Sequence, residues 1–216
     1  MAGSYRLEYL KFGATTFSFF WQGYRNGYAS YAYSGDLNND LGTGNDLLYV
    51  PRNQSEMNFQ TFTSGGKTFT AADQAAAWDA YISQDPYLSK HRGQYAQRNA
   101  VALPMVYRLD LSVNQDLFKN LGGAKHTLSF RADFLNFSNL LNHDWGVGQR
   151  LVGGSTTLSQ PLTNATVDAQ GRAAYRLRVV SGQLLNHSFE TTANGPSPSG
   201  TADVYQIQFS LKYTFN

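Results

Sequence analysis

Residues 203–216, at the end of the chain, read DVYQIQFSLKYTFN. From Tyr205 to Phe215 every second residue is apolar or aromatic, and the residues between them are polar. A period of two places successive side chains on opposite faces of a β-strand. The stretch therefore predicts a strand with one apolar face and one polar face.

Four further segments repeat this alternation, so strands are predicted near residues 4–11, 14–24, 104–117, 125–137 and 203–215. Each is close to the about 9–11 residues with which a tilted strand crosses the hydrocarbon of a bilayer. The charged residues of the strands all fall on the polar face. They are Arg6, Glu8, Arg108, Asp110, Arg131, Asp133 and Lys212. This separation favours an apolar face toward lipid and a polar interior, because Lys or Arg toward lipid costs about 2–4 kcal/mol at the bilayer midplane.

The predicted connections alternate between short and long. A tight turn at Phe12–Gly13 and the stretch KNLGGAK at 119–125 are short, whereas 25–103 and 138–202 are long. Loops beyond about 15 residues are uncommon in compact soluble domains, and this alternation is typical of outer-membrane barrels. The predicted fold class is all-β: an antiparallel transmembrane β-barrel segment, the last strands of a larger barrel, with long extracellular loops.

One of these loops is predicted to contain a short helix. Thr70 is a suitable N-cap with Asp73 three residues later, an alanine-rich stretch follows, and Pro86 comes after the expected end. The second loop is rich in glycine and serine and holds a candidate short strand at 174–180. We expect it to be exposed at the surface.

Composition restricts the function classes. The chain has 14 Tyr and 14 Phe but only 15% charged residues and a net charge of +2, so without a basic stripe no nucleic-acid partner is expected. No apolar run is long enough for a membrane helix. The N-terminus lacks the pattern of a signal peptide, so an exported protein would be expected to begin upstream of Met1.

The loop at residues 34–51 carries candidate metal ligands. Asp36, Asn38 and Asp40 occupy alternate positions, as calcium ligands do at the start of an EF-hand loop, and Asp46 would add a further oxygen. Leu41 stands where that pattern needs glycine. Two interpretations fit: a calcium site, or Asx turns that hold the loop at the strand exit.

Catalytic residues are not predicted. His91, His126, His143 and His187 are scattered without a known metal or nucleophile spacing. Asp110 and Asp133 each follow an arginine by two residues, a spacing that favours charge pairs over an acid/base pair. We therefore expect no enzyme activity.

Three stretches carry a resemblance to a known family. They are YSGDLNNDLGTGNDLLYVPRN (33–53), QDPYLSKHRGQYAQRNAVALPMVYRLDLSVNQDL (84–117) and RADFLNFSNLLN (131–142). Together with the aromatic ending, they resemble the C-terminal part of TonB-dependent outer-membrane receptors of the Oar-like type. Two departures are Leu141, where the family usually has Phe, and Asn216, which follows the usual terminal Phe.

The resemblance implies a barrel of about 22 strands filled by a plug, which takes up substrate across the bacterial outer membrane with energy from the TonB complex. The implied partners are membrane lipid, the plug and the remaining strands, and the barrel-assembly machinery, which would read strand Tyr205–Phe215. These other parts do not occur in the sequence, so we expect this chain to be inactive in transport by itself.

A second function is consistent with the sequence. A soluble or surface all-β domain would bind carbohydrate through exposed aromatics such as Trp78, Trp145 and the tyrosines of QGYRNGYASYAY at 22–33. Such a domain would not depend on lipid.

Overall fold

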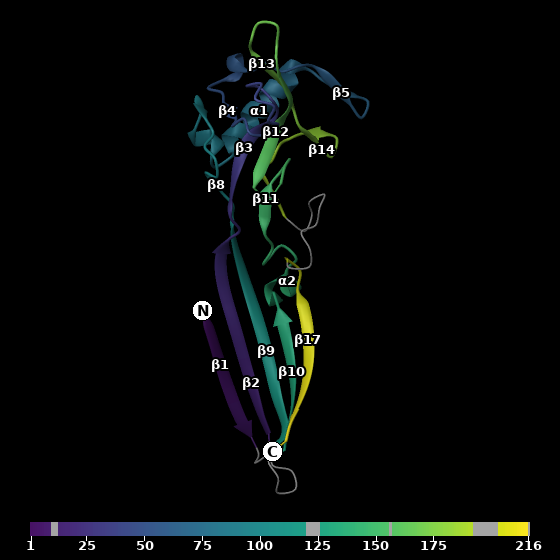
Figure 1. Cartoon of the computed structure of the whole chain (residues 1–216). Helices are drawn as coiled ribbons and strands as arrows, with labels where there is room; N and C mark the ends of the chain where they lie inside the picture. Colours follow the sequence, from purple (N-terminus) through teal and green to yellow (C-terminus); the bar gives the residue numbers. More distant parts are fainter. Residues whose placement is uncertain (10–12, 120–125, 156, 192–202, 216) are drawn as a thin grey trace. The chain divides into compact units, whose positions relative to one another are not determined.

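The computed structural model describes residues 1–9, 13–119, 126–155, 157–191 and 203–215 (Figure 1). They divide into two compact units. We call residues 1–26, 104–148 and 191–216 the strand unit, and residues 27–103 and 149–190 the insert unit.

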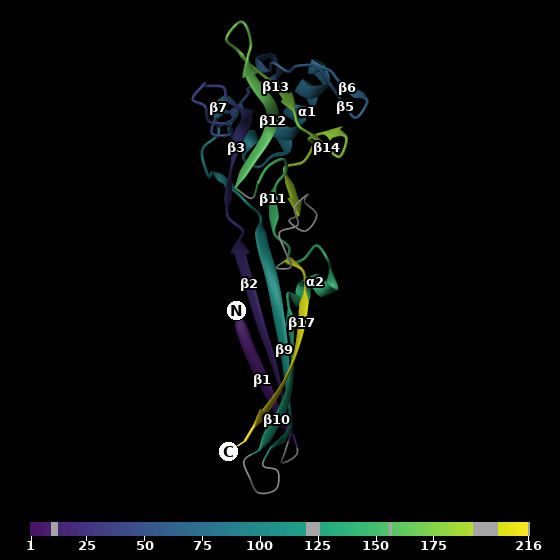
Figure 2. The ribbon, with the colours of Figure 1, turned by 45° about the vertical axis from the view of Figure 1, so that its right-hand side comes forward.

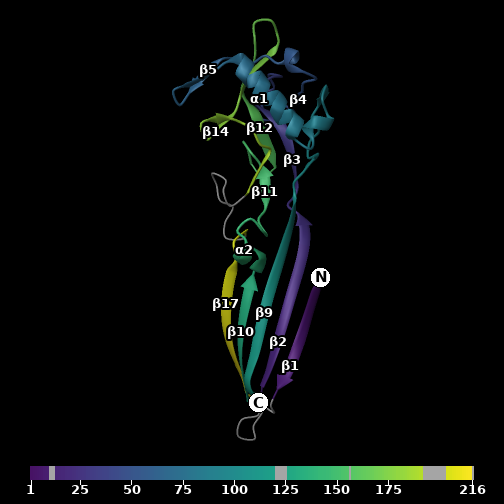
Figure 3. The ribbon, with the colours of Figure 1, turned by 180° about the vertical axis from the view of Figure 1, so that it is seen from behind.

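The strand unit is built on one antiparallel sheet of five strands, in the order β1-β2-β9-β10-β17 (Figures 1 and 2, and Figure 3 from behind). Strands that neighbour one another in this sheet follow each other in the chain once the insert unit is left out. The elements of the unit are β1 (Ala2–Tyr9), β2 (Gly13–Arg25), β9 (Met105–Lys119), β10 (Thr127–Leu135), α2 (Phe137–Leu141) and β17 (Gln206–Thr214).

All five predicted segments form strands, with ends within three residues of the expected positions. The all-β class with antiparallel sheets is therefore confirmed. The predicted turns at Phe12–Gly13 and KNLGGAK lie largely outside the described residues.

The insert unit contains a mixed sheet in the order β13-β12-β3-β8, in which β3 and β12 are parallel. Its strands are β3 (Tyr28–Gly35), β4 (Tyr49–Val50), β5 (Phe62–Ser64), β6 (Lys67–Phe69), β7 (Gln94–Tyr95), β8 (Val101–Ala102), β11 (Gln149–Leu151), β12 (Leu158–Val167), β13 (Ala173–Leu177), β14 (Val179–Val180), β15 (Gln183–Leu184) and β16 (Phe189–Thr191). Its helices are α1 (Ala71–Gln84) and the 3-10 turns η1 (Gln54–Glu56) and η2 (Leu88–Lys90).

Helix α1 begins where the sequence predicts. The Thr70 side chain accepts a hydrogen bond from the Asp73 backbone N–H at 3.1 Å, and the Asp73 carboxylate accepts one from the Thr70 N–H at 3.1 Å. This reciprocal capping box satisfies two N–H groups that a helix start leaves without partners. Trp78 and Ile82 on the helix are fully buried, so α1 is a packing element of the insert unit.

The description of 25–103 and 138–202 as surface loops is too simple. Segments from both fold together, through the parallel pair β3 and β12, around a hydrophobic core of their own. The alternation rule missed β12 because LSQPLTNATV mixes polar and apolar residues without a strict period and contains a proline. The short strand expected at 174–180 appears as β13 and β14.

Within the described ranges, no helix combines the length and the apolar composition that a membrane-spanning helix needs.

Candidate functional site

The five-stranded sheet presents an apolar face that is open to its surroundings. The strand register aligns apolar residues in rows that cross all five strands. One row is Tyr5, Phe17, Val113, Ala132 and Phe209; the next is Gly3, Phe19, Leu111, Phe134 and Ile207. Phe209 is 66% exposed and Leu211 is 69% exposed. A soluble sheet normally covers such a face with a second layer, because buried apolar area is what stabilises it.

The opposite face of the same sheet is polar and charged. Its rows alternate with the apolar rows: one is Arg6, Thr16, Asn114, Arg131 and Ser210, and another is Ser4, Ser18, Ser112, Asp133 and Gln208.

Charge pairs join side chains across and along this polar face. The Arg131 guanidinium lies 2.7 Å from the Asp133 carboxylate, as the sequence predicted, and Arg6 lies 2.8 Å from Asp116. The Asp110 carboxylate accepts the backbone N–H of Asn136 at 2.7 Å.

The stretch FLNFSNLLN, at 134–142, makes a group of side-chain hydrogen bonds to the backbone at one end of the sheet. Asn136 is buried and adopts a left-handed backbone conformation, with φ of 52°. Its side-chain amide donates to the carbonyls of Gly146 and Asp203, at 3.1 and 3.2 Å. Asn139 accepts the backbone N–H of Tyr205 at 3.2 Å. These hydrogen bonds therefore connect the residues that follow β10 to the residues that precede β17.

The predicted calcium ligands lie in one loop, where their side-chain oxygens accept hydrogen bonds from backbone N–H groups of the same loop. Asp36 accepts the N–H groups of Asp40 and Leu41, at 3.2 and 2.9 Å, and Asn38 accepts the Asp40 N–H at 3.0 Å. Asp46 accepts the Leu37 N–H at 2.7 Å. Among the described residues no group of three or more His, Cys, Asp or Glu side chains could hold a metal ion. The interactions are those of Asx turns, and calcium binding stays a prediction.

Two of the aromatic residues named for carbohydrate binding are fully buried. Trp78 has no exposed area and Tyr31 is equally buried, so both are core residues and the expectation for Trp78 is wrong. Trp145 is 55% exposed and Tyr28 lies on the surface.

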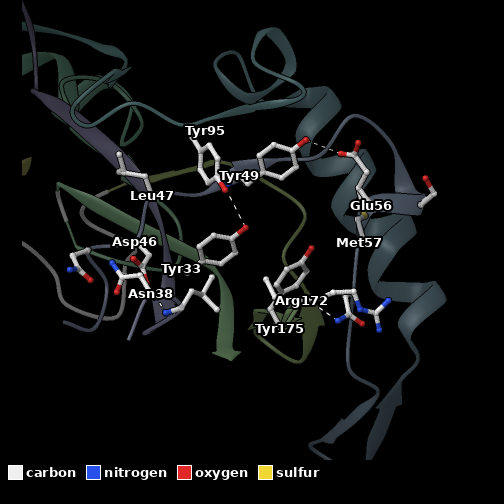
Figure 4. A pocket seen from close by; sticks show the side chains of 15 residues that line it. Tyr33, Asn38, Asp46, Leu47, Tyr49, Glu56, Met57, Tyr95, Arg172 and Tyr175 are labelled. Carbon is white, nitrogen blue, oxygen red and sulfur yellow. Dashed lines mark hydrogen bonds between the residues drawn. The ribbon is translucent and has the colours of Figure 1, made fainter. Parts of the chain in front are cut away.

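A pocket of about 830 Å³ lies within the insert unit (Figure 4). Four tyrosine rings line it, one from each of four strands: Tyr33 of β3, Tyr49 of β4, Tyr95 of β7 and Tyr175 of β13. The Tyr33 and Tyr175 ring centroids are 5.9 Å apart, and those of Tyr49 and Tyr95 are 5.3 Å apart. This volume and lining match the size and aromatic character of small-molecule sites.

Polar groups stand around these rings. The Glu56 carboxylate accepts the Arg52 N–H at 2.9 Å and the Tyr49 hydroxyl at 3.1 Å. These two hydrogen bonds, the backbone one first, lower the pKa of Glu56 below its usual value, so it is ionised at neutral pH. Burial raises the pKa of Tyr33 and of Tyr175, so both hydroxyls keep their protons.

Little in the sequence indicates this pocket. Tyr33 and Tyr49 lie in the stretch at 33–53 that carries the family resemblance, and Tyr95 lies in the one at 84–117. In the chain, strands β9 and β10 lie between Tyr175 and the other three tyrosines. The pairing of β3 with β12, and of β12 with β13, brings Tyr175 near Tyr33.

No protein-family model matches the chain, and the searches of curated proteins and of solved structures gave no significant match.

Proposed function

We propose that the chain is the C-terminal part of the barrel of a TonB-dependent outer-membrane receptor, of the Oar-like type, in the bacterial cell outer membrane. In this role the strand unit forms barrel wall and the insert unit contributes ligand-facing segments for energised uptake. The chain has no enzyme activity of its own and does not transport alone.

One observation carries the proposal: the five-stranded sheet has an apolar face and a charged face, and among the described residues of the strand unit no second layer covers either face. Lipid on the apolar side and water on the charged side would satisfy both faces. A soluble β-sandwich instead packs apolar faces together, and its charged faces are outside.

The two edges of the sheet indicate what else the receptor needs. In the described part of the chain, β1 and β17 each have a neighbouring strand on one side only. In lipid, each unsatisfied backbone group costs several kcal/mol, so further strands are required at both edges. The proposed partners are these strands, a plug and the TonB complex, and the β17 region, Tyr205–Phe215, is the segment proposed for the barrel-assembly machinery.

Both segments that form the insert unit leave the sheet at the same end. The connection after β2 begins beyond the pair Arg25 and Met105, and the connection after β10 begins beyond the pair Leu135 and Gln206. This agrees with a barrel in which elaborated segments lie on one side of the membrane.

Fractionation tests the proposal directly. We expect the purified chain to aggregate in buffer and to become monodisperse in detergent, because the apolar face requires a lipid-like solvent. A monodisperse monomer without detergent would reject the barrel and favour the soluble carbohydrate-binding alternative, for which exposed Trp145 and Tyr28 remain. Energy-dependent uptake by this chain alone in liposomes would contradict the requirement for a plug.

We also propose that calcium binds to the loop through the side chains of Asp36, Asn38, Asp40 and Asp46. A calorimetric titration of the protein with Ca²⁺ tests it, with an Asp36→Ala, Asp40→Ala double variant as control. Heat that disappears in the double variant would support the site. No heat in the parent would leave the loop with a structural role only.

A further inference from the structure

The tyrosine pocket of the insert unit has a polar lining of a particular kind. Carboxylate and amide oxygens of this lining are acceptors for a ligand, beside tyrosine hydroxyls that can both donate and accept. The Asn45 side-chain N–H group donates to Asp40 at 2.8 Å, and that of Asn58 donates to Asp168 at 3.0 Å and to the Ala173 carbonyl at 3.1 Å. This leaves the carbonyl oxygen of each amide as an acceptor for a ligand, together with the second N–H of Asn45.

Charge adds to this preference. Asp46 and Glu56 are the carboxylates of the lining. Its one cation among the described residues is Arg172, whose guanidinium lies 3.0 Å from the Asp168 carboxylate. The N–H of Arg172 also binds Asp168, and together these contacts lower the pKa of Asp168, which stays ionised. The charge of Arg172 is thus offset within the protein, and the lining is acidic.

We propose that this pocket binds an organic cation, a ligand with an ammonium or guanidinium group on a body that packs against tyrosine. Ammonium and guanidinium groups are donors without acceptors, so they match the carboxylate and amide oxygens of the lining. Tyrosine faces attract such cations through the ring quadrupole. Anionic ligands are disfavoured by Asp46 and Glu56, and neutral saccharides would lack the charge attraction of these two carboxylates.

The inference rests on the proposed function for its biological meaning, since it gives the receptor's ligand a chemical class. The pocket itself lies wholly in the insert unit, so binding can be measured whether or not the strand unit enters a membrane. A protein that is soluble without detergent but binds the cation would therefore refute the barrel and leave the pocket.

A pair of blocked peptides separates charge from shape. We would titrate the whole chain, purified in detergent, with acetyl-Ala-Arg-Ala-amide and with the same peptide carrying citrulline, the neutral isostere of arginine. We expect the arginine peptide to bind about tenfold more tightly, and the difference to shrink as salt is added. Equal affinities, or no binding of the arginine peptide by protein with a native near-ultraviolet spectrum, would overturn the proposal.

Isosteric variants identify the acceptors. Asp46→Asn and Glu56→Gln remove charge but keep a carbonyl oxygen for the Leu37 and Arg52 N–H groups, so the fold is preserved. Each is expected to weaken the arginine peptide about fivefold. Asp144→Asn, in the strand unit, is the control and should change nothing. Loss of affinity in the control to the same extent would show a non-specific charge effect and reject the site.

A matched tyrosine pair tests the rings. Tyr95 is 69% exposed and lines the pocket, whereas Tyr28 is 55% exposed and lies outside its lining. Tyr95→Ala should weaken the arginine peptide about threefold and Tyr28→Ala should leave it unchanged. If the neutral trisaccharide maltotriose binds instead, and its affinity falls in Tyr95→Ala but not in Asp46→Asn, the pocket is a saccharide site and the cation proposal fails.

Discussion

The backbone N–H of Asn136, at the end of β10, donates to the Asp110 carboxylate of β9 at 2.7 Å. The Asn136 side chain meanwhile reaches the carbonyls of Gly146 and Asp203. One buried residue therefore holds together two adjacent strands, a turn and the chain that enters β17, within the strand unit.

Replacement of this residue should be strongly destabilising. Asn136→Ala removes both side-chain donors, leaves two carbonyls without those partners, and places a residue that disfavours φ of 52° in a left-handed conformation. We expect a loss of about 2–3 kcal/mol in the free energy of unfolding, measured by urea titration in mild detergent. Asn142→Ala, six residues away, is the control, and an equal effect there would reject a special role for Asn136.

The two faces of β17 give a matched pair for lipid contact. Phe209 lies on the apolar face and is 66% exposed, and its neighbour Gln208 lies on the charged face, in the row of Asp133. We expect Phe209→Lys to lower the fraction of protein that floats with phosphatidylcholine liposomes, since lysine toward lipid costs about 2–4 kcal/mol at the midplane. Gln208→Lys should float like the parent. Similar losses in both variants would contradict the assignment of faces.

A tryptophan pair tests which aromatic residues are structural. Trp78 is fully buried in the core of the insert unit, stacked on Tyr81 with ring centroids 5.2 Å apart. Trp78→Ala should cost about 3–5 kcal/mol in the free energy of unfolding. Trp145→Ala, at a side chain that is 55% exposed, should change it by less than about 0.5 kcal/mol. Denaturant unfolding of both variants checks this, and a neutral Trp78→Ala would mean that the core is formed differently.

The capping box of α1 should make stability depend on pH. The Thr70 hydroxyl and N–H lower the pKa of Asp73 below its usual 3.8, so the folded state favours the carboxylate. The contribution of Asp73 is therefore complete above pH 3.8 and is lost as the pH falls through the lower value in the folded protein. We expect the parent to be more stable than Asp73→Asn at neutral pH, with the gap closing in acid. If the difference in the free energy of unfolding between the parent and Asp73→Asn does not change with pH, the Asp73 carboxylate is not the stabilising group.

Sequence periodicity was sufficient to predict the strands of the strand unit, because the alternation that defines each strand lies within a single short segment. Tyr205, Ile207 and Phe209 define a face without reference to any other strand. The order β1-β2-β9-β10-β17 then follows from pairing strands that are close neighbours in the chain once the long connections are set aside. The α1 start was predictable for the same reason, since Thr70 and Asp73 are three residues apart.

The insert unit could not be predicted in this way. β3 and β12 pair in parallel although the whole of β9 and β10 lies between them in the chain, and no short-range pattern encodes such a partner. The pocket depends on that pairing, because Tyr33 and Tyr175 come from its two sides. Likewise the sequence placed Asp36, Asn38 and Asp40 at suitable spacing for a cation, whereas the fold turned their oxygens toward the N–H groups of their own loop.

The sequence by itself therefore determined the five strands of the strand unit, their two faces, the charge pair of Arg131 and Asp133, and the start of α1. Tertiary structure decided that the long connections fold into a unit with its own core, that Trp78 is buried, and that four tyrosines meet around one pocket. The physical reason is that an alternating or capped segment restricts its own backbone, whereas contacts between distant segments form only when the chain closes on itself and buries enough apolar surface to offset the lost entropy.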